Sequence, residues 1–223
     1  MFAISENFTA AATDYLYLLE RRYPQKAALK LVGDRFQLFG TERSMLYRGI
    51  AASTQVNNRK NKRLEKIKRN SILQIDGYNV IRMIGSYLLG RAVFISMDGF
   101  LRDASEMHRS TLKTEILDKT MSILIEYLKQ AHIDEVYFYI DEPVSKSGEL
   151  AAQINSLFNI KDIKGEALTT YSPDKILIQT NFGIVCTADS AIIDNCSVNI
   201  FDLPRAILNL YFNPVFFDFT KLF

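Results

Sequence analysis

The stretch Ser71–Val80 reads SILQIDGYNV, and the interpretation of the whole chain begins with it. An apolar run that ends at Asp76 and is followed by Gly77 is typical of a buried strand that delivers a carboxylate to the carboxyl edge of a parallel sheet. α/β proteins bind their ligands at that edge. This motif alone is explained equally simply if Asp76 is the N-cap of the next helix, because Asp is a favoured N-cap residue.

Two further strands are predicted to end in the same way. Val136–Ile140 (VYFYI) is rich in β-branched and aromatic residues and ends at Asp141, and Gly183–Thr187 (GIVCT) is followed two residues later by Asp189. Amphipathic helices are predicted between these strands, over Tyr78–Leu89, Ser110–Ala131 and Glu149–Phe158. The alternation predicts an α/β fold with a mainly parallel sheet covered by helices on both faces, a Rossmann-like three-layer arrangement.

The remaining elements are shorter. An Asp-Gly pair at Asp98 and Gly99 lies between two apolar runs in Arg91–Asp103, which predicts a β-hairpin. Further strands are expected at Glu166–Thr170 and Val198–Phe201. Helices are expected at Pro173–Gln179 and Pro204–Leu210, each opened by a proline that suits a first helical turn.

The chain before Ser71 has a different character. Short amphipathic helices are predicted over Asn7–Arg22, from Pro24 to Gly33, and from an N-cap at Thr41. We therefore expect a small all-α N-terminal unit over residues 1–57, a basic linker or helix over residues 58–70, and the α/β domain over residues 71–223. The helical unit is too small to bury a large core alone, so it should pack on the α/β domain or on a second copy of the chain.

Charge is distributed unevenly along the chain. Residues 58–69 carry seven basic and one acidic side chain, whereas the whole chain has a net charge of only +2. A solvated connection explains such a run, and so does a grip on a polyanion such as nucleic acid. Under the second interpretation, the seven basic residues of this run and one lysine in the loop after Asp141 contact phosphates. These residues are Arg59, Lys60, Lys62, Arg63, Lys66, Lys68, Arg69 and Lys146.

Carboxylates that converge at one sheet edge repel one another, and a divalent cation relieves that repulsion. Oxygen ligands favour Mg²⁺ or Mn²⁺, which bridge to phosphate oxygens and lower the pKa of a bound water. This chemistry predicts hydrolysis of a phosphodiester.

The order of the acidic motifs, IDGYN, then YID, then SPDKIL, then VCTADSAII, resembles that of the PIN-like and NYN nucleases. The resemblance covers roughly Ser71 to Leu210. It implies a PIN-like fold and a catalytic metal site at Asp76, Asp141, Asp174 and Asp189, with Asn79 and Thr187 as motif companions. Together with the helical N-terminal unit, the chain is also similar to an uncharacterised archaeal family that joins such a unit to a PIN-like domain.

For some acidic residues and one histidine, the sequence allows two roles. Many PIN domains have a glutamate at the middle position, so either Asp141 or Glu142 points into the site. Asp174 is also interpreted as a helix cap. Asp194 is either a group that supports the metal ligands or a plain surface carboxylate, and His108 is interpreted as a surface residue or as a phosphate contact.

Two alternatives to a nuclease remain: a non-catalytic module that binds RNA or a nucleotide at the same edge, and a structural partner protein. RNA is the expected nucleic acid, with single-stranded DNA as an alternative, and a homodimer would form through the N-terminal helices or the aromatic tail YFNPVFFDF. No apolar run has the length of a membrane span. Only two cysteines occur, and both fall in predicted buried elements, so we expect a cytoplasmic protein that does not bind a membrane.

Overall fold

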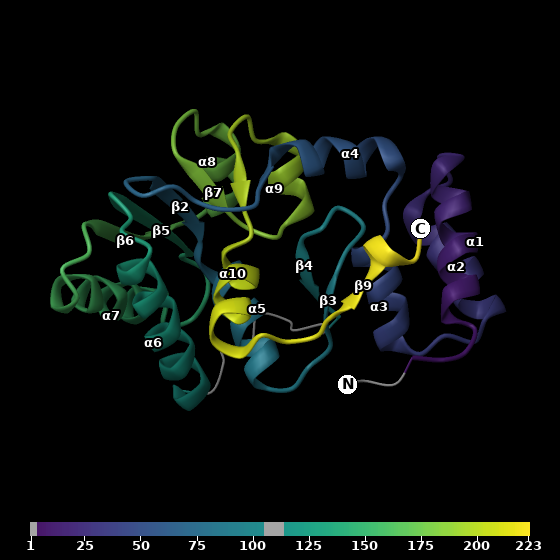
Figure 1. The fold of residues 1–223 in the computed structure, drawn as a ribbon, viewed down its shortest axis with the longest axis horizontal. Coiled ribbons are helices and arrows are strands. Elements are labelled where there is room, and N and C mark those ends of the chain that lie inside the picture. The colour runs from purple at the N-terminus through teal and green to yellow at the C-terminus, as the bar shows by residue number, and fades with distance from the viewer. Residues whose placement is uncertain (1–3, 105–113) are drawn as a thin grey trace.

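The computed structural model describes residues 4–104 and 114–223 (Figure 1). Its main body is a six-stranded sheet with the order β1-β8-β7-β2-β5-β6, in which every adjacent pair is parallel. The strands are β1 (Arg63–Leu64), β2 (Ile72–Asp76), β5 (Glu135–Asp141), β6 (Gly165–Thr170), β7 (Ile184–Cys186) and β8 (Ile200–Phe201). The predicted α/β fold is therefore confirmed.

Helices cover both faces of this sheet (Figure 1). One face is covered by α5 (Gly77–Leu88), α6 (Thr114–Gln130), α7 (Ser147–Ile160) and α10 (Leu203–Phe212), and the other by α8 (Pro173–Gln179) and α9 (Ser190–Asn195). Side chains in β5 alternate between the faces: Phe138 packs in the larger core and Tyr139 beside Leu177 and Ile192. The predicted start of α6 at Ser110 lies outside the described residues.

The predicted hairpin is confirmed by the antiparallel pairing of β3 (Val93–Ile95) with β4 (Leu101–Asp103). The C-terminal strand β9 (Phe217–Asp218) pairs parallel to β3 and is followed by the short helix η1 (Phe219–Lys221). The ring of Phe219 lies 5.9 Å from that of Phe8 and 5.5 Å from that of Phe94. The aromatic tail therefore closes the core of the N-terminal unit within the same chain.

The N-terminal unit contains α1 (Phe8–Glu20), α2 (Gln25–Arg35), α3 (Gly40–Gly49) and α4 (Ser53–Lys62). Two predicted helix ends are wrong. Gly33 lies inside α2, which continues to Arg35, and a Cβ there would lie 2.3 Å from Nη1 at the end of the flexible Arg43 side chain. Thr41 is not an N-cap, because α3 begins at Gly40 and the carboxylate of Glu42 accepts the N–H of Phe39 at 2.9 Å.

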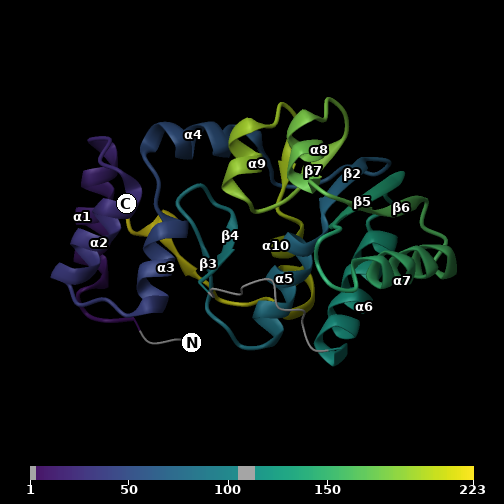
Figure 2. The same cartoon turned by 180° about the vertical axis from the view of Figure 1, so that it is seen from behind.

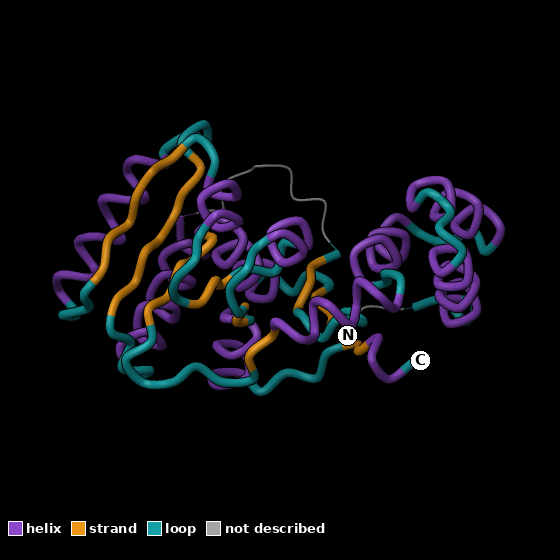
Figure 3. The backbone as a smooth tube through the Cα atoms, turned by 90° about the horizontal axis from the view of Figure 1, so that it is seen from above, coloured by secondary structure: helices purple, strands orange, loops and turns teal. Residues whose placement is uncertain are grey.

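Helix α4 bridges the two units and packs on α9, while α3 contacts the hairpin (Figures 2 and 3). The basic segment is therefore not a free linker, since residues 58–62 complete α4 and residues 63–64 form the edge strand β1. Among the residues that the structure describes, no helix combines the length and hydropathy of a membrane span.

Gly77 allows α5 to begin directly against β5. A Cβ at this position would lie 2.6 Å from the carbonyl oxygen of Tyr139 and 2.6 Å from Cε1 of Phe138. We expect Gly77→Ala to lower the free energy of unfolding, measured by urea denaturation, by about 2 kcal/mol, because neither a strand carbonyl nor a buried ring moves without strain.

The matched control is Gly148→Ala in the first turn of α7, where an added Cβ meets nothing within 4 Å. This change should leave the free energy of unfolding unchanged or raise it, because alanine favours the helix. Equal losses in the two variants would contradict the explanation.

Candidate functional site

Four aspartates meet at the carboxyl edge of the sheet. Asp76 ends β2, Asp141 ends β5, Asp174 lies in the first turn of α8, and Asp189 immediately precedes α9. All four line a single cavity of about 330 Å³. The structure thus brings together the four side chains that the sequence assigns to a metal site.

Asp76 is the buried member of this set, with only 6% of its surface exposed. It occupies the N-cap position of α5, yet its side chain makes no cap hydrogen bond with the described helix. Instead, Oγ1 of Thr187 donates to Oδ2 of Asp76 at 2.7 Å, and the N–H of Asp189 donates to the same hydroxyl oxygen at 3.0 Å. The turn after β7 therefore supplies the main contact of the Asp76 carboxylate, and the backbone N–H of Asn79 in the first turn of α5 also acts to lower its pKa.

Two more contacts fix this turn. Oδ1 of Asn79 accepts the N–H of Ala188 at 2.8 Å, which ties the first turn of α5 to the loop before α9. The carboxylate of Asp189 accepts the N–H groups of Ala191 and Ile192 at 2.7 and 3.3 Å, so Asp189 caps α9 while it lines the cavity. Asn79 and Thr187, the predicted companions, both position the carboxylate edge.

The cavity lining distinguishes Asp141 from Glu142. Asp141 ends β5 and lines the cavity, whereas Glu142 is exposed, begins the loop after β5 and does not line the cavity. Lys146 also lies outside the cavity lining: its side chain is 71% exposed, and its Nζ is 3.8 Å from Oε2 of Glu149.

Burial and mutual repulsion disfavour the ionised form of the aspartates that line the cavity. Burial raises the pKa of Asp76 to about 7, the hydrogen bond from Thr187 opposes that shift, and the charges of Asp174 and Asp189 add to it. Burial also raises the pKa of Asp174, with the charges of Asp189 and Asp141 acting in the same direction. Additional positive charge in the cavity would therefore stabilise the ionised aspartates.

The donor set suits a hard divalent cation, because every candidate ligand is a carboxylate oxygen. Within residues 4–104 and 114–223, no three Asp, Glu, His or Cys side chains are arranged so that they could hold one metal ion as they stand. Mg²⁺ keeps several of its waters and commonly takes only one or two protein carboxylates. Asp76, with its repelling neighbours Asp174 and Asp189, fits that mode of binding.

Six further residues in the lining were not assigned to the site from the sequence: the polar or charged Arg48, Tyr78, Arg82 and Asp103, and the apolar Met83 and Val144. Arg82 follows Asn79 by three residues on α5, and this helical spacing was a usable signal. Arg48 comes from α3 of the N-terminal unit, and its Nη1 donates to Oδ1 of Asp103 at 2.8 Å. No local pattern marks Arg48, because only the packing of the two units brings it to the cavity.

Arg59 and Lys62, which were assigned to nucleic-acid contacts from the sequence, bind groups of the protein itself in the structure. Arg59 is buried, with Nη1 3.1 Å from Oδ2 of Asp98 and with Nε and Nη2 donating to the carboxylate of Asp194 at 2.6 and 2.7 Å. Nζ of Lys62 donates to the carbonyl oxygens of Ile193, Asp194 and Cys196 at the end of α9. These charges hold α4 to the α/β domain, and Asp194 serves this contact instead of supporting the four aspartates.

The rest of the basic segment lies away from the carboxylates. Lys68 and Arg69 directly precede β2 and are exposed at its amino end, whereas Asp76 ends the same strand. Arg63 is ion-paired with Glu65. The remaining predicted phosphate contacts do not line this cavity, and their role in nucleic-acid binding stays a prediction: Lys60, Arg63, Lys66, Lys68, Arg69 and Lys146. His108 lies outside the described residues.

Comparison with known proteins places the chain in a family. Residues 64–206 match the family described as "Domain of unknown function (DUF5616)". The chain belongs to this family. Residues 7–62, which hold α1 to α4, match "Protein of unknown function (DUF434)", so the two matches meet where α4 passes into β1. A relative from Methanocaldococcus jannaschii, "Uncharacterized protein MJ0935", is 32% identical over 190 residues, which cover 84% of this chain and 89% of that protein. No solved structure matches the chain.

In metal-free protein, Asp76 should make stability depend on pH. Its pKa is about 7 in the folded chain, against an ordinary value of 3.8, so between these values the folded state binds more protons than the unfolded state. The free energy of unfolding should therefore fall as pH rises from about 4 to about 7. Asp76→Asn keeps an acceptor for Thr187 and removes this contribution, which raises the free energy of unfolding above pH 7 by roughly 4 kcal/mol at most.

Urea denaturation over a pH series in EDTA measures this effect. Glu142→Gln, which changes an exposed carboxylate outside the cavity, should leave the pH profile as it is in the wild type. Identical profiles for the wild type and Asp76→Asn would show that Asp76 does not titrate as described.

Proposed function

We propose that this protein is a divalent-metal-dependent nuclease that hydrolyses phosphodiester bonds in RNA. One observation carries the proposal: carboxylates from β2, β5, α8 and α9 line a single cavity, and the buried one is held by the hydroxyl of Thr187. Oxygen-only clusters of this kind serve metal-assisted phosphoryl chemistry. The resemblance of the acidic motifs to PIN-like and NYN nucleases supports the same activity.

The chain's own residues divide the work. Asp76, Asp141, Asp174 and Asp189 would hold Mg²⁺ or Mn²⁺, which supplies a Lewis acid for phosphate oxygens and a bound water of lowered pKa. Arg82 and Arg48 line the same cavity, where their guanidinium groups would orient the anionic phosphate. Asp103 holds Arg48 at the cavity, so the N-terminal unit contributes a cation to the site.

A cytoplasmic location belongs to the proposal. Cys186 and Cys196 are both buried free thiols. Reduced thiols without a disulfide framework fit a reducing compartment, which is also where cellular RNA is available.

A direct assay incubates the full chain with end-labelled single-stranded RNA and Mn²⁺. We expect cleavage that EDTA abolishes, and Asp174→Asn should reduce the rate by about 100-fold or more. Changes to residues that merely support metal ligands already cost ten- to hundred-fold, and Asp174 is a proposed ligand. Asp174 is a suitable target because it is exposed, so its replacement should leave the fold intact.

The matched pair for this assay is Asp141→Asn and Glu142→Gln, which alter adjacent carboxylates inside and outside the cavity. Only Asp141→Asn should lose activity. Wild-type protein that cuts neither RNA nor single-stranded DNA, or Asp174→Asn protein that cuts as fast as the wild type, would refute the proposal.

A further inference from the structure

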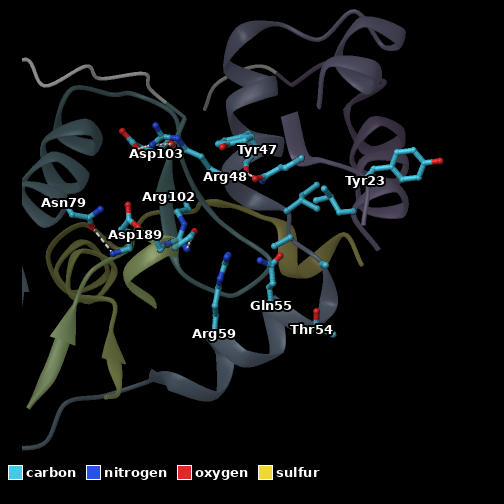
Figure 4. Close-up of a pocket in the computed structure, with 18 of the residues that line it drawn as sticks. Tyr23, Tyr47, Arg48, Thr54, Gln55, Arg59, Asn79, Arg102, Asp103 and Asp189 are labelled. Carbon is cyan, nitrogen blue, oxygen red and sulfur yellow. Dashed lines mark hydrogen bonds and ion pairs between the residues drawn. The ribbon is translucent and has the colours of Figure 1, made fainter. Parts of the chain in front are cut away.

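A second, larger cavity of about 720 Å³ lies between the helical N-terminal unit and the α/β domain (Figure 4). Its walls come from α1 to α4 and the loops between them on one side, and from α5, β4 and the start of α9 on the other. It adjoins the carboxylate cavity, since the two share the lining residues Arg48, Asn79, Met83, Asp103 and Asp189. A molecule bound between the two units would therefore lie next to the cavity of the four aspartates.

The larger cavity is predominantly basic. Its charged lining consists of four arginines and two aspartates: Arg22, Arg48, Arg59, Arg102, Asp103 and Asp189. Arg48, Arg59 and Arg102 are ion-paired within the protein. The exposed side chain of Arg22 has no ion-pair or hydrogen-bond partner in the described part of the chain.

Arg102, which lines the larger cavity, has a side-chain donor that is not used within the described residues. It is 95% buried, and its Nη2 lies 3.2 Å from Oδ2 of Asp98 and 3.4 Å from Oγ of Ser190. Its Nη1 is also buried, with no hydrogen-bond partner among the described residues. A buried guanidinium N–H without an acceptor is costly, and an anionic oxygen at this point would satisfy it. Figure 4 shows Arg102 between Asp189 and Arg59.

Aromatic rings are exposed in the same lining. Tyr23 is 53% exposed and Tyr47 is 37% exposed. Figure 4 shows Tyr47 beside Arg48, and Tyr23 at the end of the cavity farthest from Asp189. Exposed tyrosines interleaved with arginines form a surface on which unpaired bases stack while the backbone phosphates meet positive charge.

We propose that this cavity is a binding groove for single-stranded nucleic acid, in which the helical N-terminal unit holds the strand and directs it to the carboxylate cavity. The groove deepens the proposed nuclease function and rests on it for what happens at the aspartates. Phosphates meet Arg22, Arg48 and Arg102, and bases stack on Tyr47 and Tyr23. Only an unpaired strand leaves its base faces free for such stacking.

Fluorescence anisotropy with labelled oligouridine RNA, in EDTA so that nothing is cut, tests the groove. We expect Tyr23→Ala and Tyr47→Ala each to weaken binding by about ten-fold, the effect of losing one stacked base. Tyr17→Ala is the matched control, because Tyr17 is 54% exposed on α1 and does not line the groove. It should bind like the wild type.

The charge contribution is tested by the salt dependence of the same binding. Arg22→Asn should reduce the slope of log affinity against log salt by about 0.7, the value for one phosphate contact on a single strand. Asparagine suits this position because Arg22 has φ of 62°. Lys26→Asn, an equal loss of charge on α2 outside the groove, should leave the slope unchanged.

Each outcome decides between the two proposals. If the wild type binds RNA, the tyrosine variants lose that binding and no protein cuts RNA with Mn²⁺, the result supports the binding groove and refutes the nuclease function. Cleavage with unchanged binding by Tyr23→Ala and Tyr47→Ala refutes the groove and upholds the nuclease. Equal losses in Tyr17→Ala, or no binding of single strands by the wild type, also refute the groove. A DNA oligonucleotide of matching length shows whether the groove requires the ribose hydroxyl.

Discussion

The hydrogen bond from Oγ1 of Thr187 to Oδ2 of Asp76 joins the carboxyl ends of β7 and β2, and the candidate site depends on it. The same hydroxyl oxygen accepts the N–H of Asp189, and Asn79 binds the N–H of Ala188. Two short turns that are 111 residues apart in sequence thereby fix each other's geometry. The carboxylate held in this way is that of Asp76, which is buried. Burial disfavours its charge, and the hydrogen bond from Thr187 offsets part of that cost.

A second constraint holds the helical unit against the α/β domain. Arg59 of α4 pairs with Asp98 of the hairpin loop and with Asp194 of α9, and Arg102 shares Asp98. Although burial opposes its charge, Arg102 and the other partners keep the pKa of Asp98 below its ordinary value. The C-terminal strand β9 adds a backbone connection by pairing with β3. These contacts fix the walls of the cavity between the units and place Arg48 beside the aspartates.

Local sequence patterns were sufficient for five strands of the main sheet and for Asp76, Asp141 and Asp189. The edge strand β1 lies in a segment expected to be a basic linker or helix, and Asp174 was assigned through the resemblance to PIN-like nucleases. A strand that ends in Asp needs only its own residues to be recognised, and parallel topology then brings Asp76, Asp141 and Asp189 to one edge. The cations were not predictable in this way. Arg59 belongs to a run of basic residues that is typical of an exposed segment, but its two partners, Asp98 and Asp194, lie 39 and 135 residues away, and only Asp98 is itself buried. Arg48 likewise reaches the carboxylate cavity only because the two units pack together, and the hydrophobic periodicity within either unit does not predict that packing.

The central claim is that the cavity lined by the four aspartates binds a divalent cation, and a crystal soaked in Mn²⁺ tests it most directly. Anomalous scattering locates manganese independently of any assay for activity. The account predicts an anomalous peak in the cavity lined by Asp76, Asp141, Asp174 and Asp189, with at least two of these carboxylates as ligands. A cavity that stays without manganese under saturating Mn²⁺, or a peak bound only elsewhere on the protein, would contradict it.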